Sequence, residues 1–94
     1  MNKKIEEIKT FCKRVWLNKE SSESTGSVVA WHGRVKYRDG KPDDYIFFEV
    51  GDCSYKARLH KTSSDTILEF INKIKLLSKT ASEFAEFLEV EYNL

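Results

Sequence analysis

The middle of the chain, residues 28–62, reads VVAWHGRVKYRDGKPDDYIFFEVGDCSYKARLHKT and contains three segments in which apolar and polar residues alternate. In the first segment every second residue is apolar or small, and the residues between them are His32, Arg34, Lys36 and Arg38. A period of two is typical of a β-strand with one buried face. The alternation predicts a three-stranded antiparallel meander whose second face is basic.

Two turns fix the predicted register of these strands. Asp39-Gly40-Lys41-Pro42 is rich in turn residues, and Pro42 cannot donate a backbone hydrogen bond to a neighbouring strand. Gly51-Asp52 has a glycine at its first position, which suits a two-residue type II′ hairpin loop. This loop predicts that Phe48 lies opposite Tyr55 on the apolar face of the sheet.

The predicted register places the outward-facing rings of Tyr45 and Phe47 between cations from both neighbouring strands. A four-residue first loop puts Lys36 opposite Tyr45 and Arg34 opposite Phe47. The second loop puts Lys56 opposite Phe47, and cross-strand neighbours interact at this distance. The candidate binding residues on this face are His32, Arg34, Lys36, Arg38, Tyr45, Phe47, Glu49, Lys56, Arg58 and His60.

Three interpretations of this basic, aromatic face remain open. Rings with cations at their rim suit single-stranded nucleic acid, because bases stack on the rings and phosphates pair with the cations. The same face suits a protein surface that is anionic or of mixed charge. It also fits a solvated sheet on which Lys and Arg stems cover two rings. A strand edge at Val28–Ala30 would in addition allow homo-oligomerisation by strand pairing.

The composition limits the class of function. A chain of 94 residues is expected to form one domain, residues 1–94, and its 16 Lys and Arg nearly balance its 15 Asp and Glu. The net charge of +1 gives no global attraction to nucleic acid or membrane. The chain has no apolar run long enough to span a bilayer and no signal-peptide core at its start. We therefore expect a cytoplasmic protein in which Cys12 and Cys53 are buried free thiols.

Helical periodicity predicts helices on both sides of the meander. Over Lys3–Leu17 the apolar residues recur at helical spacing, as Ile5, Ile8, Phe11, Cys12, Val15 and Trp16. Ser63-Ser64-Asp65 can cap a second helix, and Thr66-Ile67-Leu68-Glu69 also has capping-box spacing for its start. Thr80-Ala81-Ser82-Glu83 has the same spacing, so it predicts a break near Ser78-Lys79 and a third helix. Helices packed on the apolar sheet face give a two-layer α+β domain.

The last predicted helix carries only acidic charge, namely Glu83, Glu86, Glu89 and Glu91. A solvated outer face is the simplest interpretation of these residues. A contact with a basic groove on a partner is the alternative, which makes the helix a second candidate surface. Trp16 and Trp31 occupy apolar positions and are expected in the core.

No motif in the chain indicates catalysis. Neither His32 nor His60 has a Ser or Cys nucleophile placed beside it by a recognisable motif. The predicted pairing of His32 with Glu49 favours a salt bridge over an acid–base pair. Glu86 and Glu89 lack a third residue that could complete a metal site. We expect no enzyme activity, no cofactor and no metal.

The predicted element order resembles two families. Helix, three strands and helix over Lys3–Leu77 resemble the double-stranded RNA-binding domain, although Ser63-Ser64-Asp65 stands where that family has a lysine cluster. With the acidic last helix, the order is similar to small phage-encoded anti-CRISPR inhibitors. The second resemblance implies an inhibitor that docks on a nucleic-acid-handling, host-defence protein. We therefore predict a non-catalytic binding or inhibitor module, with direct binding of single-stranded nucleic acid on the sheet as the alternative.

Overall fold

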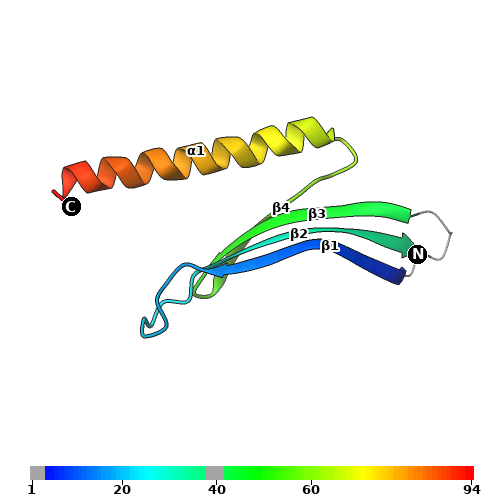
Figure 1. Ribbon diagram of the computed structural model, residues 1–94, viewed down its shortest axis with the longest axis horizontal. Helices are drawn as coiled ribbons and strands as arrows, with labels where there is room; N and C mark the ends of the chain where they lie inside the picture. Colours follow the sequence, from blue (N-terminus) through cyan, green and yellow to red (C-terminus); the bar gives the residue numbers. More distant parts are fainter. Residues whose placement is uncertain (1–3, 38–41) are drawn as a thin grey trace. The chain divides into compact units, whose positions relative to one another are not determined.

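The chain divides into two compact units, Met1–His60 and Lys61–Leu94. The computed structural model describes residues 4–37 and 42–94, with side chains over 7–35 and 44–94. The first unit is a four-stranded antiparallel sheet whose strands follow chain order, and the second contains one helix (Figure 1). The elements are β1 (Lys4–Trp16), β2 (Ser27–Tyr37), β3 (Pro42–Asp52), β4 (Tyr55–His60) and α1 (Ile67–Glu91).

The α+β class is confirmed, but three predicted details of the element order are wrong. The sheet has four strands instead of three, the first described element is a strand instead of a helix, and one helix follows the sheet instead of two. The element order on which both family resemblances rest therefore differs from the observed order. Packing of a helix layer on the sheet stays a prediction.

The segment predicted as the N-terminal helix is β1, an edge strand that pairs antiparallel with β2. A β-bulge at Thr10 inserts one extra residue, and the Thr10 hydroxyl donates to the backbone carbonyl of His32 at 3.0 Å. Because of this bulge Ile8 and Phe11 lie on one face, since they pair with Arg34 and His32. Apolar residues three apart therefore share a face in this strand, as they do in a helix.

The register of β2 and β3 differs from the predicted one by an odd number of residues. Phe47 lies opposite Trp31, whereas the sequence predicts Arg34, which is three residues away. Because side chains alternate between the two faces of a sheet, an odd shift exchanges the faces of one strand relative to its neighbour. The cations of β2 and the rings of β3 are therefore on opposite faces.

The β3–β4 hairpin turns two residues later than predicted. Asp52 pairs with Tyr55, so the loop is Cys53-Ser54 instead of Gly51-Asp52. Cys53 has a φ of 53°, and a type II′ loop has positive φ at this first position. Phe47 lies opposite His60 instead of Lys56, a shift of four residues. Because four is even, the residues of β4 keep their predicted face and only their partners change.

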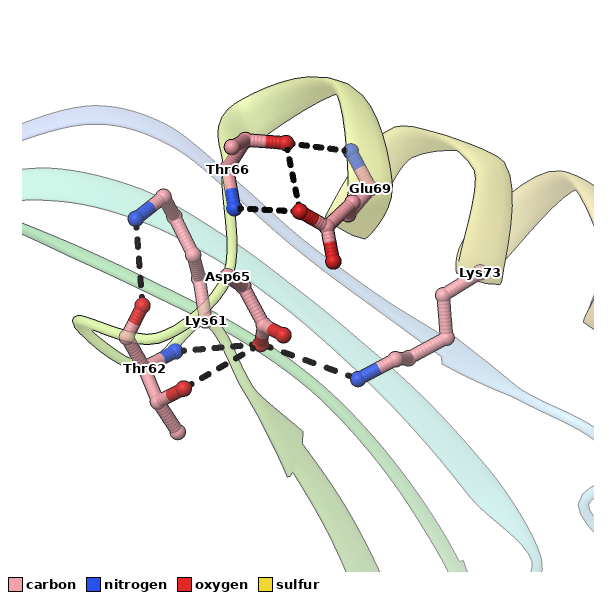
Figure 2. A network of polar contacts seen from close by, with 6 residues as sticks. All are labelled: Lys61, Thr62, Asp65, Thr66, Glu69 and Lys73. Carbon is pink, nitrogen blue, oxygen red and sulfur yellow. Dashed lines mark hydrogen bonds and ion pairs between the residues drawn. The ribbon is translucent and has the colours of Figure 1, made fainter.

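A network of polar contacts fixes the start of α1 (Figure 2). Thr66 is the N-cap: its hydroxyl accepts from the Glu69 backbone N–H at 3.1 Å, and the Glu69 carboxylate accepts from the Thr66 backbone N–H at 3.4 Å. The predicted capping box is therefore confirmed. The neighbouring Asp65 carboxylate accepts from the backbone N–H and the hydroxyl of Thr62, both at 3.3 Å, and pairs with Lys73 at 3.7 Å.

This network makes the start of α1 sensitive to acid. The hydrogen bond from the Thr62 backbone holds the pKa of Asp65 below its ordinary value; desolvation opposes this, and the charge of Lys73 adds to the lowering. A carboxyl with a lowered folded-state pKa stabilises the folded state above its unfolded pKa, and this stabilisation disappears as pH falls through the lowered value. We expect acid titration followed by circular dichroism to reduce the helicity of wild type over a pH range in which Asp65→Asn is unaffected. Identical acid transitions would contradict this.

The helix α1 continues through the predicted break near Ser78-Lys79, so that break is wrong and Thr80 lies in the helix interior. Thr66→Ala removes an N-cap and is expected to destabilise α1 by about 1 kcal/mol. Thr80→Ala removes a β-branched residue from the helix interior and is expected to stabilise α1 by about 0.5 kcal/mol. Thermal unfolding followed by circular dichroism compares the two variants. Equal destabilisation by both substitutions would contradict a continuous helix.

Candidate functional site

Three rings on β2 and β3 mark one face of the sheet, which we call the aromatic face after Trp31, Tyr45 and Phe47. Trp31, Phe47 and His60 lie opposite one another in a row across β2, β3 and β4. The rings of Trp31 and Phe47 are nearly parallel, with centroids 6.2 Å apart and planes at 10°. Tyr45 meets Phe47 and His60 edge-on, at centroid distances of 5.7 Å. These four side chains are half-buried or exposed, so they present ring surface on which a planar group can stack.

Two cations flank these rings. The Arg58 guanidinium carbon lies 3.9 Å from the centroid of Phe47, and the Lys9 ammonium lies 5.4 Å from that of Trp31. Arg58 also donates from Nε and Nη2 to one oxygen of Glu49, each at 3.1 Å, which fixes the guanidinium over the ring. The Glu49 side chain is 14% exposed, so this pair is partly shielded from water. Because Arg58 is already neutralised by Glu49, Lys9 is the freer of the two cations that lie over these rings.

The predicted basic, aromatic face is divided between the two faces of the sheet. The aromatic face keeps Tyr45, Phe47, Glu49, Lys56, Arg58 and His60. His32 and Arg34 lie on the opposite face, where they pair across the strands with Ile46 and Asp44. The side chain of Lys36 and the whole of Arg38 lie outside the described residues.

The observed contacts of His32 and Arg34 also differ from the predicted ones. The predicted salt bridge between His32 and Glu49 is wrong, because the two residues lie on opposite faces of the sheet. The His32 imidazole instead contacts the Thr10 hydroxyl, and the Arg34 guanidinium pairs with Asp44 at 3.4 Å. His32 and Arg34 therefore do not contribute to the aromatic face.

Trp31 and Lys9 contribute to the aromatic face although the sequence does not predict either of them as a binding residue. Trp31 is predicted to be core and Lys9 to be on a helix, yet they lie together beside Phe47. The alternation in β2 indicates that Trp31 shares a sheet face with Val29 and Val35. It does not indicate that Phe47 of β3 lies on the same face. Trp16, also predicted to be core, is 62% exposed.

The opposite face of the sheet, which we call the apolar face, carries apolar side chains on all four strands. The pairings of the strands place these residues on it: Ile8, Phe11, Val15, Val28, Ala30, Ile46, Phe48, Val50, Ala57 and Leu59. All ten are half-buried or exposed, and Phe11 is 54% exposed. The buried apolar side chains in the described part of the sheet are Val29 and Val35, which belong to the aromatic face.

The two sheet edges differ from the predicted edge. Val28–Ala30 lies in β2, which is paired on both sides, so this segment is not a sheet edge as the sequence predicts. Homo-oligomerisation through an edge strand stays a prediction. The edges are β1 and β4. The edge strand β1 has two register shifts, and β4 is short and carries Lys56 and Arg58. Bulges, short length and basic side chains all disfavour edge-to-edge pairing.

The second candidate surface lies on the last turns of α1. Glu83, Glu86, Glu89 and Glu91 are all exposed there. Glu83 pairs with Lys79 at 3.9 Å within the helix, and the last turn has no basic residue. The negative end of the helix dipole therefore carries acidic side chains, an arrangement that is unfavourable without a cationic neighbour.

Other parts of the described chain give no stronger candidate site. Cys12 and Cys53 are both exposed, so the prediction of buried thiols is wrong. A cavity of ≈ 420 Å³ is lined mainly by polar residues of the β1–β2 connection, together with Trp16. Among the described side chains, no group of three or more His, Cys, Asp or Glu is placed to hold a metal ion. The described residues also contain no helix with the length and apolar character needed to cross a bilayer.

Comparison with known proteins gives no match to a family model, a curated protein or a solved structure.

Proposed function

We propose that the chain is a non-catalytic binding module that docks on a protein partner through the apolar face of its sheet. The observation that carries this proposal is that the ten apolar side chains of this face span four strands and that the sheet itself buries none of them. Soluble monomers rarely expose contiguous apolar patches larger than a few hundred Å², and larger patches mark interaction sites.

The chemistry of the apolar face favours a protein over a nucleic acid. Its inner strands β2 and β3 carry aliphatic and phenylalanine side chains, such as Val28, Ile46 and Phe48. Charged residues lie toward the margin: Lys13 on the edge strand β1, and Arg34, which pairs with Asp44, near the end of β2. An apolar centre with charge toward its margin is the composition of a protein–protein interface. We propose that the partner is a nucleic-acid-handling or host-defence protein and that docking inhibits it, as expected from the sequence.

Two variants of β1 test which face docks. Phe11→Glu places a charge on the apolar face, and Cys12→Glu places the same charge on the aromatic face one residue away. Both side chains are exposed on an edge strand, so neither substitution is expected to unfold the sheet. With the partner purified from an extract of the host cell, we expect Phe11→Glu to weaken binding by about 30-fold or more, the loss of a hot-spot residue. Cys12→Glu is expected to bind like wild type.

The reverse order of affinities, or equal affinities for Phe11→Glu and wild type, would exclude docking through the apolar face. Circular dichroism of both variants shows whether a loss of binding is accompanied by unfolding.

Direct binding of single-stranded nucleic acid on the aromatic face is a second candidate function. The observation that favours it is the row of Trp31 and Phe47 rings with Lys9 beside it, because sequence-tolerant binding of single strands combines stacking platforms with cations. The Glu49 carboxylate, which neutralises Arg58, and the net charge of +1 weaken this candidate relative to protein docking.

A further inference from the structure

The β1–β2 connection, residues 17–26, borders a cavity that the proposed function does not use. Its volume of ≈ 420 Å³ lies within the range of small-molecule sites. Among the described residues that line it, Trp16 is the one aromatic residue, and the others are polar or glycine. Such a lining favours a small ligand that is rich in polar groups and also has a face that can stack on a ring.

Hydrogen bonds within the connection fix the shape of this cavity. The backbone N–H of Leu17 donates to the carbonyl of Gly26 at 2.8 Å, and the backbone N–H of Gly26 donates to the side-chain oxygen of Asn18 at 2.6 Å. The backbone N–H of Ser22 donates to the carbonyl of Lys19 at 2.9 Å and closes a turn. A site whose groups are held in place before binding loses less conformational freedom when a ligand enters.

Gly26 allows the Asn18 amide to lie where it does. A β-carbon at Gly26 would lie 2.8 Å from the side-chain oxygen of Asn18, so a larger residue would displace this amide. Because the Gly26 N–H is a donor, the atom that faces it is the Asn18 oxygen, and the amide NH₂ is left for another partner. This NH₂ has no hydrogen-bond partner among the described residues, so it can donate to a ligand in the cavity.

The polar lining offers both donors and acceptors without net charge. Lys19 and Glu20 contribute one charge of each sign. Ser24 and Thr25 add hydroxyl groups, each of which can donate and accept. A sugar carries the same mixture of donors and acceptors on a neutral ring. A phosphate or a nucleotide would instead meet the carboxylate of Glu20, which is a like charge.

Trp16 provides a surface on which a sugar ring can rest. The residue is 62% exposed, and the guanidinium carbon of Arg14 lies 5.4 Å from its ring centroid. Arg14 does not line the cavity, so it leaves the ring open on the cavity side. The C–H groups on one face of a pyranose carry partial positive charge, and the face of an aromatic ring is negative. Stacking on Trp16 therefore complements the hydrogen bonds that the rest of the lining offers.

We propose that this cavity binds a neutral saccharide, with one sugar ring stacked on Trp16 and sugar hydroxyl groups bonded to Asn18 and to the polar side chains of residues 19–25. The residues that line the cavity do not belong to the apolar face of the sheet. The saccharide site therefore goes beyond the function proposed above, and its test does not depend on that function.

Nuclear magnetic resonance titration of the wild-type chain tests the site directly. The probes are maltotriose, cellotriose and triacetylchitotriose, each at about 10 mM, which nearly saturates a site with a Kd of about 1 mM. We expect at least one probe to shift the indole N–H signal of Trp16 and the amide signal of Gly26, while the indole signal of Trp31 stays in place. No shift of Trp16 with any of the three probes would overturn the proposal. A shift of Trp16 with a short oligonucleotide alone would also overturn it.

Variants with matched controls locate the contacts of the probe that binds best. Trp16→Ala removes the stacking surface and is expected to weaken binding by about tenfold or more. Leu17→Ala changes the neighbouring exposed residue, which does not line the cavity, and is expected to bind like wild type. Equal affinities for Trp16→Ala and wild type, or an equal loss in both alanine variants, would contradict stacking on Trp16.

The role of the Asn18 amide is tested by Gly26→Ala, which displaces it from the backbone of the connection. We expect about fivefold weaker binding, the loss of one hydrogen bond. Gly51→Ala, at a buried glycine that does not line the cavity, is expected to leave the affinity unchanged. Circular dichroism of each variant shows that the sheet is retained. Unchanged affinity in Gly26→Ala would exclude the Asn18 amide from the site.

Discussion

Gly33→Ala is expected to destabilise the sheet by about 1–3 kcal/mol, the cost of forcing extra volume into a packed site. A β-carbon at Gly33 would lie 2.5 Å from the backbone oxygen of Ile8 and 3.3 Å from the indole nitrogen of Trp31. The first contact is with backbone, so a side-chain rotation cannot relieve it. Because Ile8 belongs to β1, the strand must move away from β2 or the pairing around Gly33 must open. We expect urea unfolding to report the loss of stability and hydrogen exchange to show that the amides of β1 lose protection first.

Gly51→Ala is the matched control for this prediction. Gly51 is also a buried glycine within a strand, but its nearest atom to an added β-carbon is the side-chain Cγ of Lys56 at 3.5 Å, an ordinary contact. We expect Gly51→Ala to change the free energy of unfolding by less than about 1 kcal/mol. Equal destabilisation by Gly33→Ala and Gly51→Ala would show that the close contact between Gly33 and β1 is not the cause of the lost stability.

The sequence predicted elements well where a local signal was strong. The alternation over β2 and β4 identified both strands, and the capping box placed the start of α1 at Thr66. These signals depend on neighbours within a few residues of one another, which the sequence displays directly. The second capping-box pattern, at Thr80, was misleading because such spacing also occurs by chance inside a continuous helix.

The segment that became β1 could not be identified from periodicity. Its bulge at Thr10 puts Ile8 and Phe11 on one face, so the apolar spacing is the spacing of an amphipathic helix. A bulge depends on the partner strand, since it is defined by the two-to-one pairing with β2. The register of β2 and β3 also depends on pairing between strands. The position of Phe47 relative to Trp31 is set by the length of the β2–β3 loop, which the sequence leaves open. An error of three residues was enough to divide the predicted binding face.

Because the predicted binding face is divided between the two faces of the sheet, variants on each face can test whether single-stranded nucleic acid binds the aromatic face. The sequence places Arg34 beside Phe47 as a cation of the binding face, whereas the structure places Lys9 beside Trp31 and moves Arg34 to the other face. Lys9→Glu and Arg34→Glu change the net charge equally, so a difference between them reports position and not total charge. We expect Lys9→Glu to weaken binding of a single-stranded oligonucleotide by about tenfold and Arg34→Glu to leave it nearly unchanged.

The ring surface is tested by Phe47→Leu, which keeps an apolar side chain and removes the stacking plane beside Trp31. We expect this variant to lose about 1–3 kcal/mol of binding free energy, which is about 5- to 150-fold in affinity. Fluorescence anisotropy titrations at low and high salt measure these differences, and the salt slope counts the phosphates that are neutralised. If Arg34→Glu were the variant that lost affinity, the nucleic acid would lie on the apolar face. If wild type bound no oligonucleotide at low salt, the aromatic face would have no role in nucleic-acid binding, and docking of a protein on the apolar face would stand alone.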